Sequence, residues 1–177
     1  MYSETFNKSN ISNTSYYEDL QDFLDAGEDL NIEYIRPHEL FLLVSNAFSD
    51  RRFTIEHNSD EAGAYVSIEK KGMCNITITS ITGNWAADTD SNHLIMIGVI
   101  KELEPSQVDH QFVGQLNRQN YDISVYINDD DEHNPRIEVQ QSILLDGGCN
   151  FSNIANRINH FISSVGLLKL TLSDAQF

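Results

Sequence analysis

The chain has 177 residues, a hydrophobic fraction of 40% and a formal net charge of −16. This length and composition predict one compact domain with its own hydrophobic core, and they exclude a disordered chain. With 27 acidic residues against 11 basic ones, the chain repels phosphate backbones and anionic membranes, so we expect neither nucleic acid nor a membrane as a partner. The same charge favours solubility or a basic protein partner.

The two cysteines, Cys74 and Cys149, are too few for a disulfide framework or a zinc site. The two cysteines can be two free thiols or can form one disulfide bridge with each other. The first twenty residues lack the basic and apolar regions of a secretory signal, and no apolar run reaches the roughly 18 residues of a membrane span. We therefore expect a cytoplasmic protein.

Residues 1–33 form a predicted acidic and polar N-terminal extension, and residues 34–177 form the predicted folded domain. The extension contains eight acidic residues and a single basic one, Lys8. Its apolar residues recur at the spacing of a short amphipathic helix, which Gly27 would end: Tyr16, Leu20, Phe23 and Leu24. The extension is either a solvated tail or a docking helix for the domain or for a partner.

The first half of the domain reads as a helix followed by four strands. Pro37 suits the first turn of a helix, and apolar residues follow at helical spacing up to Ala47. Alternating or apolar runs separated by turn residues predict strands over residues 52–57, 63–70, 73–80 and 93–100. The last of these is apolar on both faces, which is typical of a buried strand.

The second half reads as helix, two strands and helix. Ser106 and Asp109 have the spacing of a capping box and predict a helix start near Ser106. Strands are predicted at 121–127 and 136–146, with an acidic turn between them and a break at Gly147 and Gly148. A helix follows over 150–166, with Gly166 as its C′ residue. The tail, 167–177, is expected to pack at an edge or to hang free.

Consecutive strands joined by short turns predict an antiparallel sheet. The predicted fold class is α+β, with the order α-β-β-β-β-α-β-β-α and the helices on one face of the sheet.

Residues 113–165 resemble the YbjN family, whose members are described as bacterial sensory transduction regulators. The resemblance rests on a helix ending in an Asn-rich corner, Asn117 and Asn120, then two strands around an acidic turn, the Gly147-Gly148 break and a final apolar helix. It extends less strictly over residues 35–165. The family implies a fold similar to that of type III secretion chaperones, which are small, acidic and usually dimeric. It implies no catalytic residue in this sequence.

No pattern in the sequence indicates a catalytic, metal or cofactor site. No serine stands in a nucleophile motif, the six histidines are scattered, and no glycine-rich phosphate loop occurs. The acidic turn 128–134 lacks the Gly and Glu of a calcium loop. Cys149, placed before a helix start, is the best candidate for a reactive thiol, and a small residue at a turn is the alternative. We expect no enzyme, metal, cofactor or small-molecule substrate.

The sequence favours a regulatory or protein-interaction domain, expected to form a homodimer. Trp85, in a loop, can either anchor a partner or fold back over the sheet edge. The helix starting near Ser106 supplies the other candidate contact residues, Phe112, Val113 and Arg118. We interpret Asn117 and Asn120 as a structural joint. Three alternatives stay open: a chaperone-like binder of an extended client peptide, an enzyme with an unrecognised site, and a domain whose N-terminal extension does the signalling.

Overall fold

A computed structural model of the chain describes residue 22 and residues 31–49, 52–60, 63–71, 74–81, 85–86, 89–104, 109–119, 122–130 and 134–174. Most of the predicted N-terminal extension therefore lies outside the described residues, and so do Ser106 and Asn120. None of the described helices is long and apolar enough to cross a membrane.

The central feature is a six-stranded antiparallel sheet with the strand order β2-β3-β4-β5-β7-β6. The predicted α+β class and the antiparallel pairing are confirmed. The strands are β2 (Phe53–Asp60), β3 (Gly63–Lys70), β4 (Cys74–Ser80), β5 (His93–Glu102), β6 (Ser124–Asn128) and β7 (Arg136–Leu144). Because the pleat alternates side chains between faces, each strand presents one set of residues to the helices and the other set to the opposite face.

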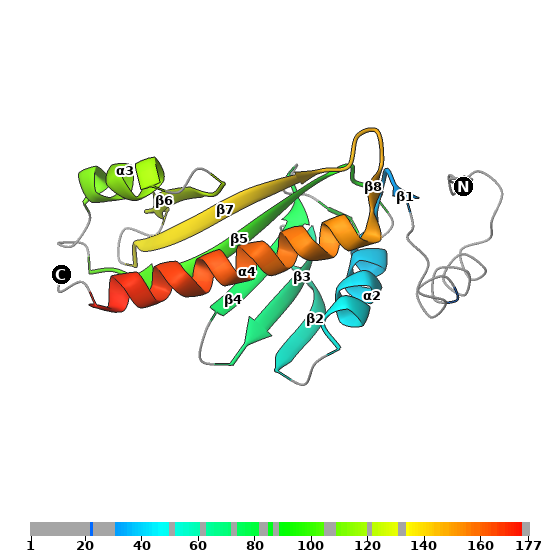
Figure 1. Cartoon of the computed structure of the whole chain (residues 1–177), viewed down its shortest axis with the longest axis horizontal. Helices are drawn as coiled ribbons and strands as arrows, with labels where there is room; N and C mark the ends of the chain where they lie inside the picture. Colours follow the sequence, from blue (N-terminus) through cyan, green and yellow to red (C-terminus); the bar gives the residue numbers. More distant parts are fainter. Residues whose placement is uncertain are drawn as a thin grey trace.

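Two helices cover one face of the sheet. Figure 1 shows α4 (Phe151–Asp174) lying along the sheet, with α2 (Pro37–Ala47) beside its N-terminal end. The α4 helix contacts β4, β5 and β7, whereas α2 contacts β2 and β3. Pro37 begins α2 as predicted, and the Glu39 carboxylate accepts a hydrogen bond of 2.8 Å from the Arg36 backbone N–H. Helices and sheet thus enclose a single apolar core on this side.

The core consists of strand residues that face the helices and of the apolar stripes of α2 and α4. Its strand residues have essentially no exposed surface, and they include Val66, Ile68, Ile76, Ile78, Leu94, Met96, Val139 and Ile143. On β5 these buried residues alternate with half-buried ones on the other face. The prediction of a strand buried on both faces is therefore confirmed for one face only.

The α4 helix is longer than predicted. It continues through Gly166, which the sequence marked as the C′ residue, as far as Asp174. Gly166 has no positive φ, and Leu168 and Leu172 continue the buried stripe beyond Val165 at helical spacing. Burial of these two leucines outweighs the small helix penalty of glycine, roughly 1 kcal/mol. The predicted edge segment or free tail is thus, up to Asp174, helix.

The helix predicted from Ser106 begins later. α3 spans His110–Gln119, and the Asp109 carboxylate accepts hydrogen bonds from the N–H groups of Gln111 and Phe112, at 2.9 and 3.1 Å. Asp109 therefore caps the helix directly, and the other residue of the predicted capping box, Ser106, lies outside the described residues.

One small strand pair was not predicted. β1 (Asn31–Ile32) pairs antiparallel with β8 (Cys149–Asn150), immediately before α4. The break before β8 occurs where predicted: Gly148 N–H donates to the Leu145 carbonyl at 2.9 Å, and Gly147 and Gly148 have φ of 80° and 85°. Such angles favour glycine. The Asn31 side chain also fills the space that a Cβ at position 148 would need.

The α4 helix approaches the sheet closely at Gly98 of β5. A Cβ at this position would lie 2.9 Å from Cγ2 of Val165 and 3.3 Å from Cγ2 of Val139. Both neighbours are branched, buried side chains that cannot rotate away. Glycine at position 98 thus allows the helix to contact the central strand directly.

We expect Gly98→Ala to lower the free energy of unfolding by about 1–3 kcal/mol, because the added methyl overpacks this contact. Chemical denaturation of the two proteins measures the difference. Gly114→Ala on helix α3 is the matched control: nothing lies within 4 Å of the place that its added methyl would take, so this change should stabilise by about 0.5–1 kcal/mol. Equal stability of wild type and Gly98→Ala would contradict the packing argument.

Candidate interaction site

Trp85 is part of the core. Its side chain is only 1% exposed, and its indole N–H donates to the Thr89 carbonyl at 2.8 Å. The Trp85 carbonyl in turn accepts a hydrogen bond of 2.7 Å from the backbone N–H of Ala64, near the start of β3. The ring therefore folds back onto the domain, which was the second of the two interpretations, and in this fold it has no surface with which to anchor a partner.

The candidate contact residues on α3 divide between core and surface. Val113 is buried, Phe112 is half-buried against the core, and Arg118 is exposed. The helix packs on β6, which lies four strand spacings, about 19 Å, from the β3 strand that holds Trp85. The four candidate residues therefore do not form one site.

Asn117 joins α3 to the edge strand β6. Its side-chain carbonyl accepts a hydrogen bond of 2.7 Å from the Val125 N–H, and its side-chain NH₂ donates to the Val125 carbonyl. The amide thus takes the place of a neighbouring strand along the outer edge of β6 and blocks pairing there. This geometry is what a structural joint requires. Asn120, the other half of the motif, lies outside the described residues.

The face of the sheet opposite α2 and α4, here called the open face, is apolar at its centre. Ile95, Ile97 and Val99 of β5 are half-buried on it, although α2 and α4 pack only against the other side. The strand register places Thr77 and Thr79 on one side of them and Gln140 and Ser142 on the other. Further out on the same face lie two exposed acidic residues, Glu56 of β2 and Glu69 of β3. An apolar strip thus lies among polar and acidic residues.

At the β6 side of the open face, polar groups are buried together. Glu138 is 4% exposed and accepts hydrogen bonds from the Tyr126 hydroxyl at 2.7 Å and the Asn128 amide at 3.2 Å, and it pairs with Arg136. Burial and the adjacent carboxylate hold the pKa of Tyr126 far above its ordinary value. Because these groups satisfy one another, the cluster fixes β6 against β7.

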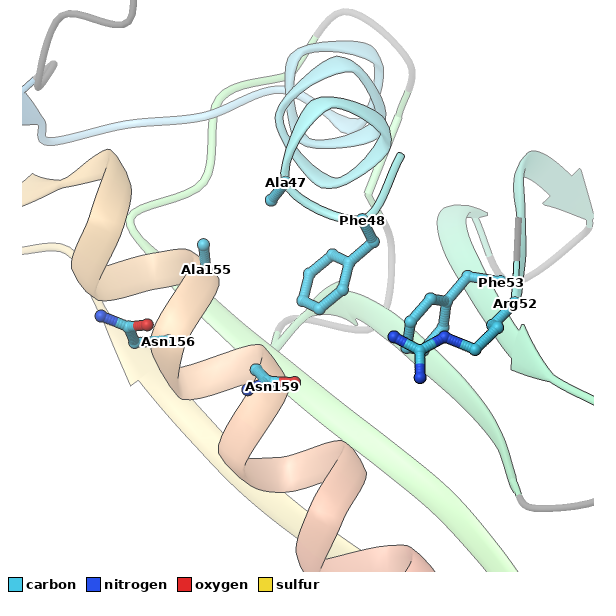
Figure 2. Close-up of a pocket in the computed structure, with 7 residues that line it drawn as sticks. All are labelled: Ala47, Phe48, Arg52, Phe53, Ala155, Asn156 and Asn159. Atoms are coloured by element: carbon cyan, nitrogen blue, oxygen red, sulfur yellow. The ribbon is translucent and has the colours of Figure 1, made fainter. Parts of the chain in front are cut away.

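A groove lies between the end of α2, the start of β2 and the first turns of α4. It has a volume of about 300 Å³ and is here called the α2–α4 groove. In Figure 2 the Phe48 ring points from α2 towards α4, and Arg52 and Phe53 lie across from Asn156 and Asn159. The rings of Phe48 and Phe53 meet edge to face, 5.3 Å apart. Ala47 and Ala155 complete the lining.

Two histidines lie close together, one on helix α2 and one on strand β2. The rings of His38 on α2 and His57 on β2 are 6.1 Å apart, and the Phe41 ring lies 6.3 Å from each. Burial, and then the charge of His57, lower the pKa of His38, although Glu39 opposes the shift. His38 is therefore disposed to be neutral in the folded protein at neutral pH.

Both cysteines are free. Cys74 is buried, and burial raises the pKa of its thiol. Cys149, the predicted reactive thiol, is half-buried in β8 and packs against the core. Within the described ranges, no group of three or more His, Cys, Asp or Glu side chains is arranged to hold a metal ion.

No known protein family matches the sequence, and no curated protein matches it either. Among solved structures, the fold is similar to that of YbjN from E. coli, described as "a putative transcription regulator", with a TM-score of 0.52. The two sequences are 14% identical over 67% of this chain and 82% of the other. At that identity the likeness shows the fold alone, and it confirms the YbjN-like architecture.

Asn117→Ala should lower the free energy of unfolding by about 1–2 kcal/mol, because the Val125 N–H and carbonyl both lose their partner. Thermal melting monitored by circular dichroism tests this, with the exposed neighbour Gln115→Ala as the control. A melting temperature equal to that of wild type would show that the joint contributes no stability.

The lowered pKa of His38 has a consequence for stability at acid pH. Since the unfolded chain binds the proton more tightly, the contribution of this residue to stability falls as pH drops below about 6.5, the ordinary histidine value. We expect the loss of stability between about pH 7.5 and pH 5.5 to be smaller in His38→Gln than in wild type. Urea denaturation at both pH values measures the difference, and His160→Gln on the surface of α4 is the control. If all three proteins lose the same stability between these pH values, the assignment of this pH dependence to His38 is wrong.

Proposed function

We propose that this protein is a non-enzymatic regulatory domain of the YbjN type, which acts in the bacterial cytoplasm by contact with a protein partner or a second copy of itself. The observation that carries the proposal is the open face, where Ile95, Ile97 and Val99 lie half-buried at the centre of the sheet. An apolar strip with a polar border is the usual composition of a protein contact surface.

The occupant of the open face in this proposal is a second copy of the chain. A face made of antiparallel strands can pack against its own two-fold copy, because two-fold symmetry repeats each contact of a residue i with a residue j as a contact of j with i. A stable dimer needs roughly 1,200–2,000 Å² of buried area in total. The strip on β5 provides the apolar centre of such a contact, its polar neighbours on β4 and β7 flank it, and Glu56 and Glu69 lie towards its periphery.

The fold likeness supports a regulatory role in coarse terms. The E. coli protein of the same architecture is described as "a putative transcription regulator". Since one fold can carry many functions, this likeness adds support only because the open face already provides a contact surface. A direct contact with nucleic acid is not part of the proposal, given the net charge of −16.

A second candidate function, binding of an extended client peptide, is favoured by the two edges of the sheet. The β6 edge is occupied by Asn117, whereas β2 pairs only with β3 among the described strands. In the six-stranded sheet, a client strand could therefore add beside β2, by backbone hydrogen bonds. A stoichiometric basic client recovered from the native host would favour this function over a self-contained regulator.

The dimer is tested by Ile97→Lys, which places a charge in the middle of the strip. Light scattering coupled to size exclusion should give a dimer for wild type and a monomer for the variant, since burying an unpaired ammonium is costly. Thr54→Lys, on the exposed β2 strand of the same face, is the control for charge and should stay dimeric. If wild type is a monomer, the proposed dimer is refuted. The β2 edge then remains as the candidate contact site.

A further inference from the structure

The open face carries a second group of apolar residues where β5 begins. The β4–β5 ladder continues beyond the end of β4, because the Ile81 N–H donates to the His93 carbonyl at 3.1 Å. On its other side, His93 pairs with Leu144 of β7. The neighbour of each of these residues within its strand is buried on the helix side. Strand alternation therefore places Ile81, His93 and Leu144 side by side on the open face, here called the end row.

The two apolar members of the end row are well exposed. Most large apolar side chains of the described residues are buried or half-buried, but Ile81 is 45% exposed and Leu144 is 53% exposed. Ile95 follows His93 on the same face of β5, so the end row and the strip on β5 are continuous. Exposed apolar side chains that adjoin an apolar strip are typical of a protein contact surface.

The size of the open face suits a second copy of the chain. Six strands at the usual spacing, each about seven residues long, make a face of roughly 29 by 24 Å, or about 700 Å². Two such faces in contact would bury about 1,400 Å², which lies within the range of about 1,200–2,000 Å² for stable complexes. One extended peptide would cover only part of this face, because a single strand is about 5 Å wide.

His93 is the titratable residue between the two exposed apolar side chains. Histidine ordinarily gains its positive charge between about pH 8 and pH 5. A neutral imidazole can be covered by apolar side chains, whereas an imidazolium loses its hydration at a high cost. A second copy that covers Ile81 and Leu144 would also remove water from the ring between them.

The groups around His93 act in the same direction. Its neighbours across the strands are apolar, and the next residues on those strands, Thr79 and Ser142, are neutral. Among the described residues, two carboxylates lie near this end of β5 in the chain. Asp90 pairs with Arg36, and Asp146 accepts a hydrogen bond from the Asn92 amide. Either carboxylate would favour the protonated ring in the free monomer, and thus would oppose dimerisation in acid.

We propose that the end row belongs to the dimer interface of the open face, and that protonation of His93 dissociates the dimer. This role of His93 rests on the proposed function, because it requires a second copy on the open face. In acid, each copy would have to release a proton before it associates. Since two histidines enter each dimer, their effects on the dimer Kd multiply.

The dimer Kd, measured by analytical ultracentrifugation at about pH 7.5 and pH 5.5, tests the proposal. For wild type the Kd should be about 10–100-fold higher at the lower pH. His93→Gln, which stays neutral, should remain a dimer whose Kd does not rise in acid. His160→Gln, on the exposed surface of α4, should behave as wild type. All three proteins keep His38, so its effect on folding is common to them.

The sign of the effect separates it from general electrostatics. Two chains that each carry −16 repel one another. Acid reduces this negative charge, so repulsion alone predicts a lower Kd at the lower pH. A Kd that rises in wild type, but not in His93→Gln, therefore assigns the effect to this imidazole.

Leu144→Ser tests whether the end row lies in the interface. It should raise the Kd at neutral pH by about tenfold or more, because each dimer loses two leucine contacts. Leu170→Ser is the matched control, since this leucine of α4 is 66% exposed and lies on the helix side of the sheet. It should leave the Kd unchanged.

The results distinguish failure of this proposal from failure of the proposed function. A wild type that is monomeric at both pH values refutes the dimer and, with it, the role of His93. A dimer that Ile97→Lys dissociates, but whose Kd is equal at both pH values, refutes only the role of His93. An equal rise of the Kd in wild type and His93→Gln does the same. If Leu144→Ser dimerises as tightly as wild type, the end row lies outside the interface.

Discussion

The contact between α4 and the central strand β5 is the constraint on which the rest of the structure depends. The helix buries a stripe from Ile154 to Leu172 against the sheet, and Gly98 lets its backbone approach the strand closely at Val165. Once α4 lies along β5, one face of the sheet is covered, and α2 can pack beside the helix only at the β2–β3 end. The groove lies where the end of α2, the start of β2 and the first turns of α4 meet (Figure 2).

The face of the sheet that α2 and α4 do not cover differs in structure from the edges of the sheet. The open face keeps an apolar centre on β5, where half-buried residues alternate with the buried ones that face the helices. The β6 edge is closed by the Asn117 amide, a device that spares the domain from pairing with other strands there. Among the described residues, the open face, the groove and the β2 edge thus stay uncovered by helices or strands.

The candidate site was less predictable than the fold. Trp85 drew attention because an aromatic residue in a polar loop can contact a partner, yet its ring reaches the core and its N–H finds the Thr89 carbonyl. The groove could not be anticipated, since Phe48, Phe53 and Asn159 come from separate elements and each reads locally as an ordinary core or surface residue. The Asn117 amide bonds the backbone of Val125, a contact typical of an amide near a helix end, and its role as a structural joint stays a prediction.

By itself the sequence determined the α+β class, the main strands, the glycine break at 147–148 and the acidity that disfavours nucleic acid, because periodicity, turn residues and charge act locally or by summation. The tertiary structure decided where elements end and which residues meet. In the tertiary structure α4 continues through Gly166, since Leu168 and Leu172 are buried beyond it. The tertiary structure also started α3 at the Asp109 cap and created β1–β8. These outcomes depend on contacts between residues far apart in the chain, and no local pattern encodes such contacts.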